Sequence, residues 1–252
     1  MRNIKLVLAY DGGPYHGWQV QPDLPTVQAM LRDALQRITG ESILPQGSGR
    51  TDAGVHALEQ VASFETTSNI PVDNFRKALN SHLPASVRIL RVEDVANDFH
   101  ARRSATAKTY QYRIFRNEIC SPFLAGYVHH HPYPLDEQAM IDAAPLVVGE
   151  HDFTSFAAVD AEKTSAPDGI LTSNVRSIFN SVWERRGEEL IYTVRGNGFL
   201  HHMVRNIVGT FLLIGKGTLK SADIRRIIGL RDRSAAGATA PACGLYLVSV
   251  KY

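Results

Sequence analysis

Apolar positions in the first hundred residues follow two patterns, one typical of strands and one typical of helices. Continuous or alternating apolar runs predict three strands, at Ile4–Tyr10, Gln60–Phe64 and Val87–Val92. Apolar residues at helical spacing predict two helices between these strands, one capped by Thr26 and ended by Gly40, the other starting at Pro71 and ending before Pro84. This half therefore alternates strands with helices.

The second half repeats this course. We expect strands at Thr109–Phe115, Val175–Trp183, Leu190–Val194 and Leu245–Val250, and helices at Leu135–Val148, Phe199–Leu213 and Ser221–Leu230. Each half approximates β-α-β-β-α-β, the split unit of ferredoxin-like folds. The predicted fold is α+β, with two ferredoxin-like subdomains of mainly antiparallel sheet flanked by helices, a boundary near Ser104 (1–104 and 105–252), and an active cleft between them.

Composition narrows the class of protein. Of 252 residues, 44% are hydrophobic and 21% charged, which is ordinary for a globular protein with a real core. The two cysteines, Cys120 and Cys243, form no ligand pattern, which favours a reducing compartment over a disulfide scaffold or zinc site. Neither a membrane-spanning apolar run nor a signal-peptide pattern is present, so a cytoplasmic location is expected.

One stretch of the chain is strongly basic, although the formal net charge is only +2. Residues 101–117 contain no acidic residue and five basic ones, interleaved with aromatic rings: Arg102, Arg103, Lys108, Arg113 and Arg116, with Tyr110, Tyr112 and Phe115. Cations that neutralise phosphates, next to rings that stack on bases, suit single-stranded or looped RNA. An edge strand guarded by arginines is the alternative.

The stretch from Gly47 to Phe64 carries the strongest candidate chemistry. A single carboxylate, Asp52, stands in a glycine-bracketed loop, two residues after Arg50. In extended backbone both side chains would lie on one side, where the guanidinium favours the ionised carboxylate. A structural Arg–Asp contact within a turn explains the same pattern.

An unbroken run, GRTDAGVHA from Gly49 to Ala57, resembles the catalytic motif of the tRNA pseudouridine synthase A family. The resemblance continues in order along nearly the whole chain, at Tyr10-Asp11-Gly12-Gly13, Gly17-Trp18-Gln19, Lys108-Thr109-Tyr110, Met203-Val204-Arg205-Asn206 and Gly244-Leu245-Tyr246. It implies an isomerase that converts uridine to pseudouridine at positions 38 to 40 of the tRNA anticodon stem-loop. It further implies a homodimer that needs no cofactor and no metal.

The resemblance also assigns roles to single residues. Asp52 corresponds to the catalytic nucleophile, although attack on C1′ and action as a base both remain open. Arg50 accompanies it, and Arg205 corresponds to its basic partner. Tyr110 corresponds to the tyrosine that packs against the target base, and Leu245 to an apolar residue beneath that base. Without the resemblance, Tyr110 and Leu245 fit an ordinary core equally well.

The expected helix Phe199–Leu213 is unusually apolar, so its polar residues must meet partners or a wet cleft. Helical spacing pairs His201 with Arg205 and His202 with Asn206.

Two features depart from the picture or complicate it. Family members often have an arginine after Ser155-Phe156, where this chain has Ala157, and Ala158–Thr172 is expected to be a mobile surface loop. The run His129-His130-His131 invites a metal interpretation, but adjacent side chains of a strand alternate sides and cannot all face one ion.

Two rival functions remain: a catalytically silent RNA-binding module, and a hydrolase that releases uracil.

Overall fold

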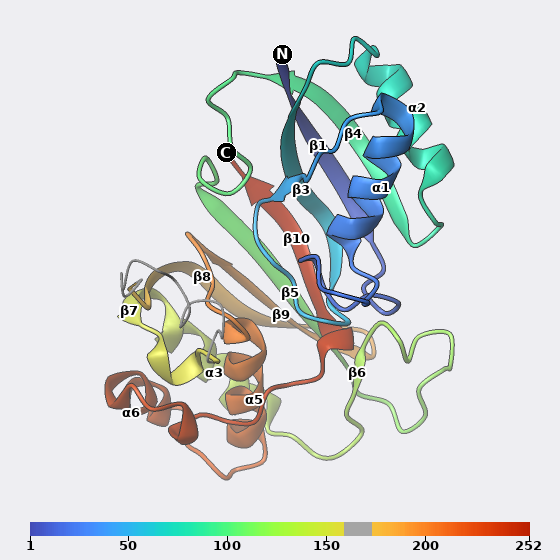
Figure 1. The fold of residues 1–252 in the computed structure, drawn as a ribbon. Coiled ribbons are helices and arrows are strands. Elements are labelled where there is room, and N and C mark those ends of the chain that lie inside the picture. Colours follow the sequence, from blue (N-terminus) through green and yellow to red (C-terminus); the bar gives the residue numbers. More distant parts are fainter. Residues whose placement is uncertain (159–172) are drawn as a thin grey trace. The chain divides into compact units, whose positions relative to one another are not determined.

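The computed structural model describes residues 1–158 and 173–252, so nearly all of the expected loop Ala158–Thr172 lies outside the described residues. Contacts divide the chain into two units, Met1–Lys108 with Tyr246–Tyr252, and Thr109–Leu245. The architecture is mixed α and β, with mostly antiparallel strand pairing and five α-helices in the described part. The expected α+β class is confirmed at this level (Figure 1).

The first unit is built on a sheet in the order β4-β1-β3-β10, with β2 beside β3. Its strands are β1 (Arg2–Tyr10), β2 (Gln46–Gly47), β3 (His56–Thr66), β4 (Val87–Val95) and β10 (Leu245–Lys251). β1 pairs antiparallel with both β3 and β4, whereas β10 runs parallel to β3 through the pairs Tyr246 with His56 and Leu247 with Ala57. This grouping differs from the expected 105–252 half, because pairing with β3 places the last strand in the first unit.

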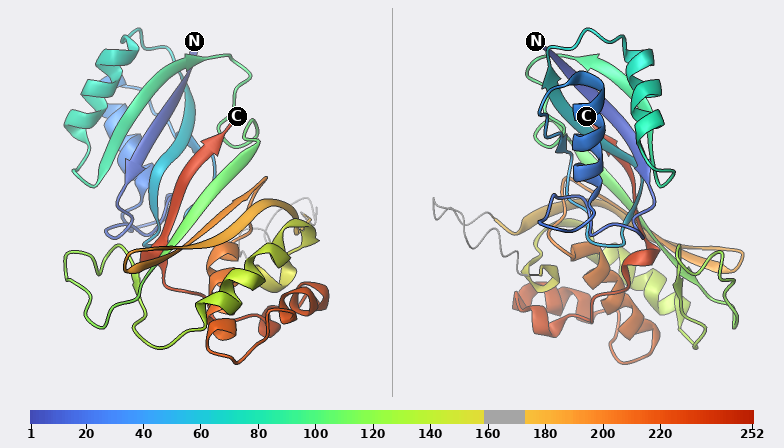
Figure 2. Two further views of the ribbon diagram at one scale, coloured as in Figure 1. Left: turned by 180° about the vertical axis from the view of Figure 1, so that it is seen from behind. Right: turned by 45° about the vertical axis from the view of Figure 1, so that its right-hand side comes forward.

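Two helices, α1 (Val27–Thr39) and α2 (Val72–His82), cover one face of this sheet (Figures 1 and 2). The predicted limits of α1 are confirmed: the Thr26 hydroxyl accepts from the Ala29 amide at 3.4 Å, and Gly40 ends the helix at φ 75°. Phe75 of α2 packs on Phe64 of β3, with ring centroids 6.0 Å apart.

The second unit has its own strand order, β5-β9-β8-β7, with β6 parallel to β5. Its strands are β5 (Ala107–Phe115), β6 (His129–His130), β7 (Gly149–Asp152), β8 (Val175–Arg186) and β9 (Glu189–Gly196). The predicted hairpin around Gly187 is confirmed as the antiparallel pair β8–β9. The short strands β6 and β7 were not predicted, because each is too brief to show an alternating pattern.

Helices of the second unit are α3 (Glu137–Ala143), α5 (Met203–Gly215) and α6 (Asp223–Leu230). Short 3-10 turns accompany them at Ala144–Val147, Thr154–Phe156, Arg233–Ala235 and Ala242–Gly244. Phe211 of α5 packs against Trp183 and Tyr192, at centroid distances of 6.0 and 5.3 Å. None of the helices in the described ranges has the length and apolarity that a bilayer crossing requires.

The start of α5 corrects the sequence prediction. The helix begins at Met203, not Phe199, because His202 has a left-handed backbone (φ 59°). His201 and His202 therefore precede the helix, and the expected i,i+4 pairs of these histidines with Arg205 and Asn206 are not formed on a helix face.

Candidate active site

Asp52 lies on the loop between β2 and β3, at the start of a tight turn. The Val55 amide donates to the Asp52 carbonyl at 3.1 Å, and Gly54 has φ 78°, as the third position of a type II turn requires. Asp52 is partly exposed and Arg50 is exposed. The loop thus presents both predicted side chains at the surface of the first unit.

Neighbouring segments hold the backbone on both sides of Asp52. The Trp18 amide donates to the Thr51 carbonyl at 3.1 Å, and the Gly54 amide donates to the Tyr15 carbonyl at 3.2 Å. The Thr51 hydroxyl shares a buried hydrogen bond of 2.9 Å with the Tyr10 hydroxyl. These bonds hold the backbone before and after Asp52, and a fixed backbone is one requirement for placing a catalytic side chain.

A buried amide, Gln60, holds the beginning of the loop. It accepts from the Ser48 hydroxyl at 2.6 Å and donates to the Gly49 carbonyl at 3.0 Å. Lys108 adds a bond of 2.6 Å from its ammonium to the Ser48 carbonyl. Sequence reasoning assigned no role to Gln60, although an amide within an apolar strand is a signal of a required hydrogen-bond partner.

Two glycines of the family-like motifs have their explanation in this loop. A Cβ on Gly17 would lie 2.5 Å from the Thr51 carbonyl oxygen, and one on Gly12 would lie 2.1 Å from the Val55 oxygen. Gly17 also has φ 86°. Both positions let a second chain segment approach the Asp52 loop more closely than a side chain permits.

The start of β3 is fixed from two directions. His56 is buried, and its Nδ1 accepts from the Gly12 amide at 3.1 Å. Its ring stacks on Tyr246 of β10, with centroids 4.8 Å apart and planes 21° apart. Tyr246, the last residue of the Gly244-Leu245-Tyr246 motif, therefore helps to hold the start of β3, which follows the Asp52 loop.

Tyr110 and Leu245, the predicted base-contacting residues, belong to the second unit and are both buried. The Tyr110 ring meets the Phe199 ring edge-on, at a centroid distance of 5.0 Å and an angle of 77°. Leu245 follows Gly244, whose position against the Tyr112 ring and the Arg113 carbonyl leaves no room for a side chain.

Arg205, on the first turn of α5, is partly buried. Its Nε donates to the Ala240 carbonyl at 2.7 Å, and its own carbonyl accepts from the Ala240 amide at 3.2 Å. These bonds fix the side chain and tie residue 240 to the helix.

The next residue, Asn206, is fully buried and joins three segments. Its amide donates to the Phe156 carbonyl at 2.7 Å, while its oxygen accepts from Arg233 at 2.9 Å and from the Thr239 hydroxyl at 2.7 Å. The expectation that polar residues of this helix must find partners is met at Asn206. Its role as the centre of this network was not predicted.

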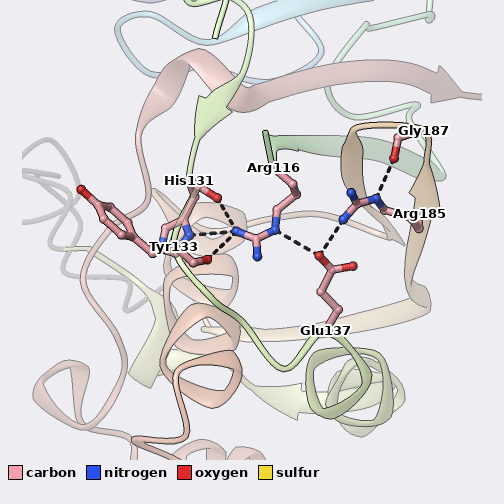
Figure 3. Close-up of polar contacts among 6 residues, drawn as sticks. All are labelled: Arg116, His131, Tyr133, Glu137, Arg185 and Gly187. Carbon is pink, nitrogen blue, oxygen red and sulfur yellow. Dashed lines mark hydrogen bonds and ion pairs between the residues drawn. The ribbon is translucent and has the colours of Figure 1, made fainter. Parts of the chain in front are cut away.

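The arginines of the basic stretch 101–117 lie in two kinds of environment. Arg113 pairs with Glu189 at 2.6 Å, and Arg116 pairs with Glu137 at 3.0 Å. Figure 3 shows Arg116 also bonded to His131 and the Tyr133 carbonyl, while Arg185 contacts the same Glu137. These ion pairs join segments of the second unit. The alternative of an edge strand guarded by arginines does not describe β5, because β5 lies next to β9 and also pairs with β6. Arg102 and Arg103 are exposed.

The three adjacent histidines have separate environments. His130 bonds to the Asn117 carbonyl at 2.9 Å, and His131 is bonded to Arg116. Burial, followed by the nearby His131, lowers the pKa of His129 to about 4. The pKa of His131 is also lowered, by burial and then by Lys216 and Arg116. The positive charges of Lys216 and Arg116 beside His131 would also repel a metal cation bound there.

The sequence of this chain is similar over its whole length to one group of enzymes. A family model described as tRNA pseudouridine synthase matches residues 6–102 and 143–252. Relatives named tRNA pseudouridine synthase A are 54% identical in Solibacter usitatus, 48% in Brevibacillus brevis and 43% in Caldicellulosiruptor bescii, each over 252 residues and the full length of both chains. Asp52, Arg205 and Leu245 fall within the ranges that the model matches, and Tyr110 falls between them.

Proposed function

The chain belongs to the tRNA pseudouridine synthase family, and we propose that it converts uridine to pseudouridine at positions 38, 39 and 40 in the anticodon stem-loop of tRNAs. The observation that carries the proposal is the unbroken GRTDAGVHA run, whose aspartate stands partly exposed on a loop with both flanks fixed.

The reaction rearranges bonds within one nucleotide. The C1′–N1 bond of uridine breaks, the base turns, and a C1′–C5 bond forms, while C5 loses a proton and N1 gains one. Atoms and electrons balance without an oxidant or a nucleotide triphosphate. We assign the catalytic carboxylate to Asp52, as nucleophile at C1′ or as base, because an ionised carboxylate is what C1′ chemistry requires here.

Arg50 and Arg205 are proposed as the cationic residues of the same site. Arg205 is suited to this role because its Nε is fixed on the Ala240 carbonyl, so the orientation of the guanidinium is defined before substrate binds. Arg50 is exposed on the Asp52 loop, where a phosphate or the target ribose can reach it.

Tyr110 and Leu245 are proposed to contact the target base after it leaves the RNA stack. Enzymes that act on a base inside a helix extrude it and hold it between aromatic or apolar side chains. The edge-on contact with Phe199 fixes the plane of the Tyr110 ring, which favours stacking of an incoming base in one orientation.

The finer architecture and the partners are part of the proposal. The antiparallel pairings of β1 with β3 and β4, and of β2 with β3, support a ferredoxin-like first subdomain, because they give the order β4-β1-β3-β2. We propose a homodimer that acts on tRNA in the cytoplasm, a location that the two free cysteines suit. An active cleft between the halves remains a prediction.

The test uses tRNA that carries tritium at uridine C5. Forming the C1′–C5 bond expels the tritium, so we expect it in water, without added nucleotide triphosphate and unchanged by EDTA. Labelled uracil as the product would identify a hydrolase, and retention of all label in bound tRNA would identify a silent RNA-binding module. Either result would refute the proposal.

A further inference from the structure

Arg102 and Arg103 differ from the other cations of the basic stretch. Lys108, Arg113 and Arg116 bond to groups of the protein. The side chains of Arg102 and Arg103 are exposed and have neither a hydrogen bond nor an ion pair within residues 1–158 and 173–252. Two adjacent guanidiniums repel each other, so a position that keeps both with no anion beside them in the described part of the chain needs another explanation.

The backbone that carries these arginines is tightly ordered. Nδ1 of His100 accepts from the Arg102 amide at 3.0 Å and from the Arg103 amide at 3.4 Å. The Ser104 amide donates to the His100 carbonyl at 2.9 Å, and the Ser104 hydroxyl accepts from the His100 amide at 3.1 Å. Burial, and next the Arg103 charge, lower the pKa of His100, which favours the neutral ring that can accept.

Ala101 anchors the same turn in the core of the first unit. Ala101 is fully buried and packs with Val7 and Val61. Its amide donates to the Ser63 hydroxyl at 3.0 Å, and its carbonyl accepts from the Tyr252 hydroxyl at 2.8 Å. With Ala101 held inward, the next two side chains are presented to solvent from a backbone that is already fixed.

We propose that Arg102 and Arg103 bind phosphates of the tRNA backbone and that His100 is the positioning residue of this element, the arginine turn (residues 100–104). The proposal rests on the proposed function, because the phosphates are those of its substrate. Guanidinium forms bidentate, charge-assisted bonds with phosphate, and a preordered backbone lowers the entropy cost of binding.

The direct test is the double variant Arg102→Gln/Arg103→Gln. The matched control is Arg37→Gln/Arg225→Gln, which removes the same charge from exposed arginines that also have no hydrogen bond or ion pair in the described part of the chain. Dissociation constants for tRNA are measured over a series of salt concentrations. Each phosphate contact contributes about 0.7 to 0.9 to the magnitude of the slope of log affinity against log salt. In the arginine-turn variant this magnitude should therefore fall by about 1.5, and tRNA binding should be roughly tenfold weaker.

The control should retain the wild-type slope. Equal losses in both double variants would show a general charge effect and overturn the proposal, as would a wild-type slope in the arginine-turn variant. Thermal unfolding of each variant verifies that the fold is kept.

His100 provides a test of positioning. His100→Ala removes the acceptor and should weaken tRNA binding, whereas His100→Asn restores an acceptor to the Arg102 amide and should recover most of the affinity. No weakening in His100→Ala, or no recovery in a folded His100→Asn, would contradict the positioning role. Binding is measured apart from tritium release, so failure of the proposed chemistry and failure of the arginine turn are distinguishable.

Discussion

The hydroxyl groups of Tyr10 and Thr51 lie 2.9 Å apart in the core of the first unit. Thr51 directly precedes Asp52, the carboxylate of the candidate site. Gln60 donates to the same Tyr10 oxygen at 3.4 Å, so the Tyr10 hydroxyl has two buried hydrogen-bond partners. Burial raises the pKa of Tyr10 to about 12, so the phenol keeps its proton across the neutral range.

Thr51→Val should therefore affect both stability and rate. The isosteric change keeps the packing but removes the Thr51 partner of the buried Tyr10 hydroxyl, at a cost of about 1–2 kcal/mol in the free energy of unfolding. Looser backbone beside Asp52 should slow turnover roughly tenfold. Denaturant unfolding and single-turnover rates measure the two effects. Adding Tyr10→Phe should recover part of the stability, and strict additivity of the two changes would contradict the bond.

Gly17→Ala should disable the site, and Gly40→Ala should not. Both glycines have positive φ, 86° and 75°, so both substitutions share a backbone strain of about 1–2 kcal/mol. Only at Gly17 does the new Cβ approach the Thr51 oxygen, at 2.5 Å, whereas at Gly40 it has no heavy atom within 4 Å. We expect a rate loss of about a hundredfold for Gly17→Ala alone. Similar rates in the two variants would show that the contact does not position the loop.

Asp52→Asn should abolish tritium release while leaving tRNA affinity and stability nearly unchanged. The amide keeps the shape of the side chain and removes only the ionised oxygen. Asp98→Asn, at an exposed aspartate of the same unit, is the control with the same change of charge. More than trace activity in Asp52→Asn, or loss of its fold, would remove Asp52 from its catalytic role.

Tyr110→Phe and Tyr110→Ala separate the hydroxyl from the ring. The phenylalanine variant keeps the edge-on contact with Phe199 and should lose only what the hydroxyl contributes. The alanine variant loses a buried ring, which should cost about 3–5 kcal/mol and also reduce capture of the base. The concentration of stem-loop RNA at which the single-turnover rate saturates measures capture of the base. If Tyr110→Ala remains folded and shows wild-type saturation, Tyr110 does not hold the base.

His129 should make stability depend on pH. Its pKa is about 4 in the folded protein, below the ordinary 6.5, and its buried Nδ1 has no hydrogen-bond partner in the described part of the chain. As the pH falls, His129 therefore binds a proton in the unfolded chain before it does so in the folded protein. Its contribution to the free energy of unfolding is complete above about pH 6.5 and is lost as the pH drops toward about 4. His129→Gln should have a smaller difference in unfolding free energy between about pH 8 and pH 5. Equal differences in both proteins would assign the dependence to other groups.

Local signals in the sequence predicted elements whose limits are determined by neighbouring residues. Thr26 and Gly40 marked the ends of α1, because a hydroxyl cap and a left-handed glycine act within one turn. The start of α5 was placed too early because Phe199 and Leu200 continue its apolar spacing. The left-handed backbone at His202 leaves no mark in that pattern.

Contacts between distant segments were not predictable in the same way. The supports of Asp52 include Tyr10, Gln60 and Lys108, which are brought together only by the folded sheet. The resemblance identified Asp52 itself, since a long motif carries its own context. It could not identify the hydrogen bonds that fix the loop, nor the network around Asn206.

The parallel pairing of β10 with β3 has a consequence for synthesis of the chain. The partner of His56 and Ala57 is Tyr246-Leu247, which a ribosome adds only after the whole second unit. Until then, the part of β3 that directly follows the Asp52 loop has an unfilled edge, and His56 lacks the ring on which it stacks. The nascent first unit can thus form its β1–β3–β4 sheet and both helices early, whereas the frame of the candidate site is completed last. A chain interrupted before residue 246 would expose that edge to other strands, and this favours aggregation over an active fragment.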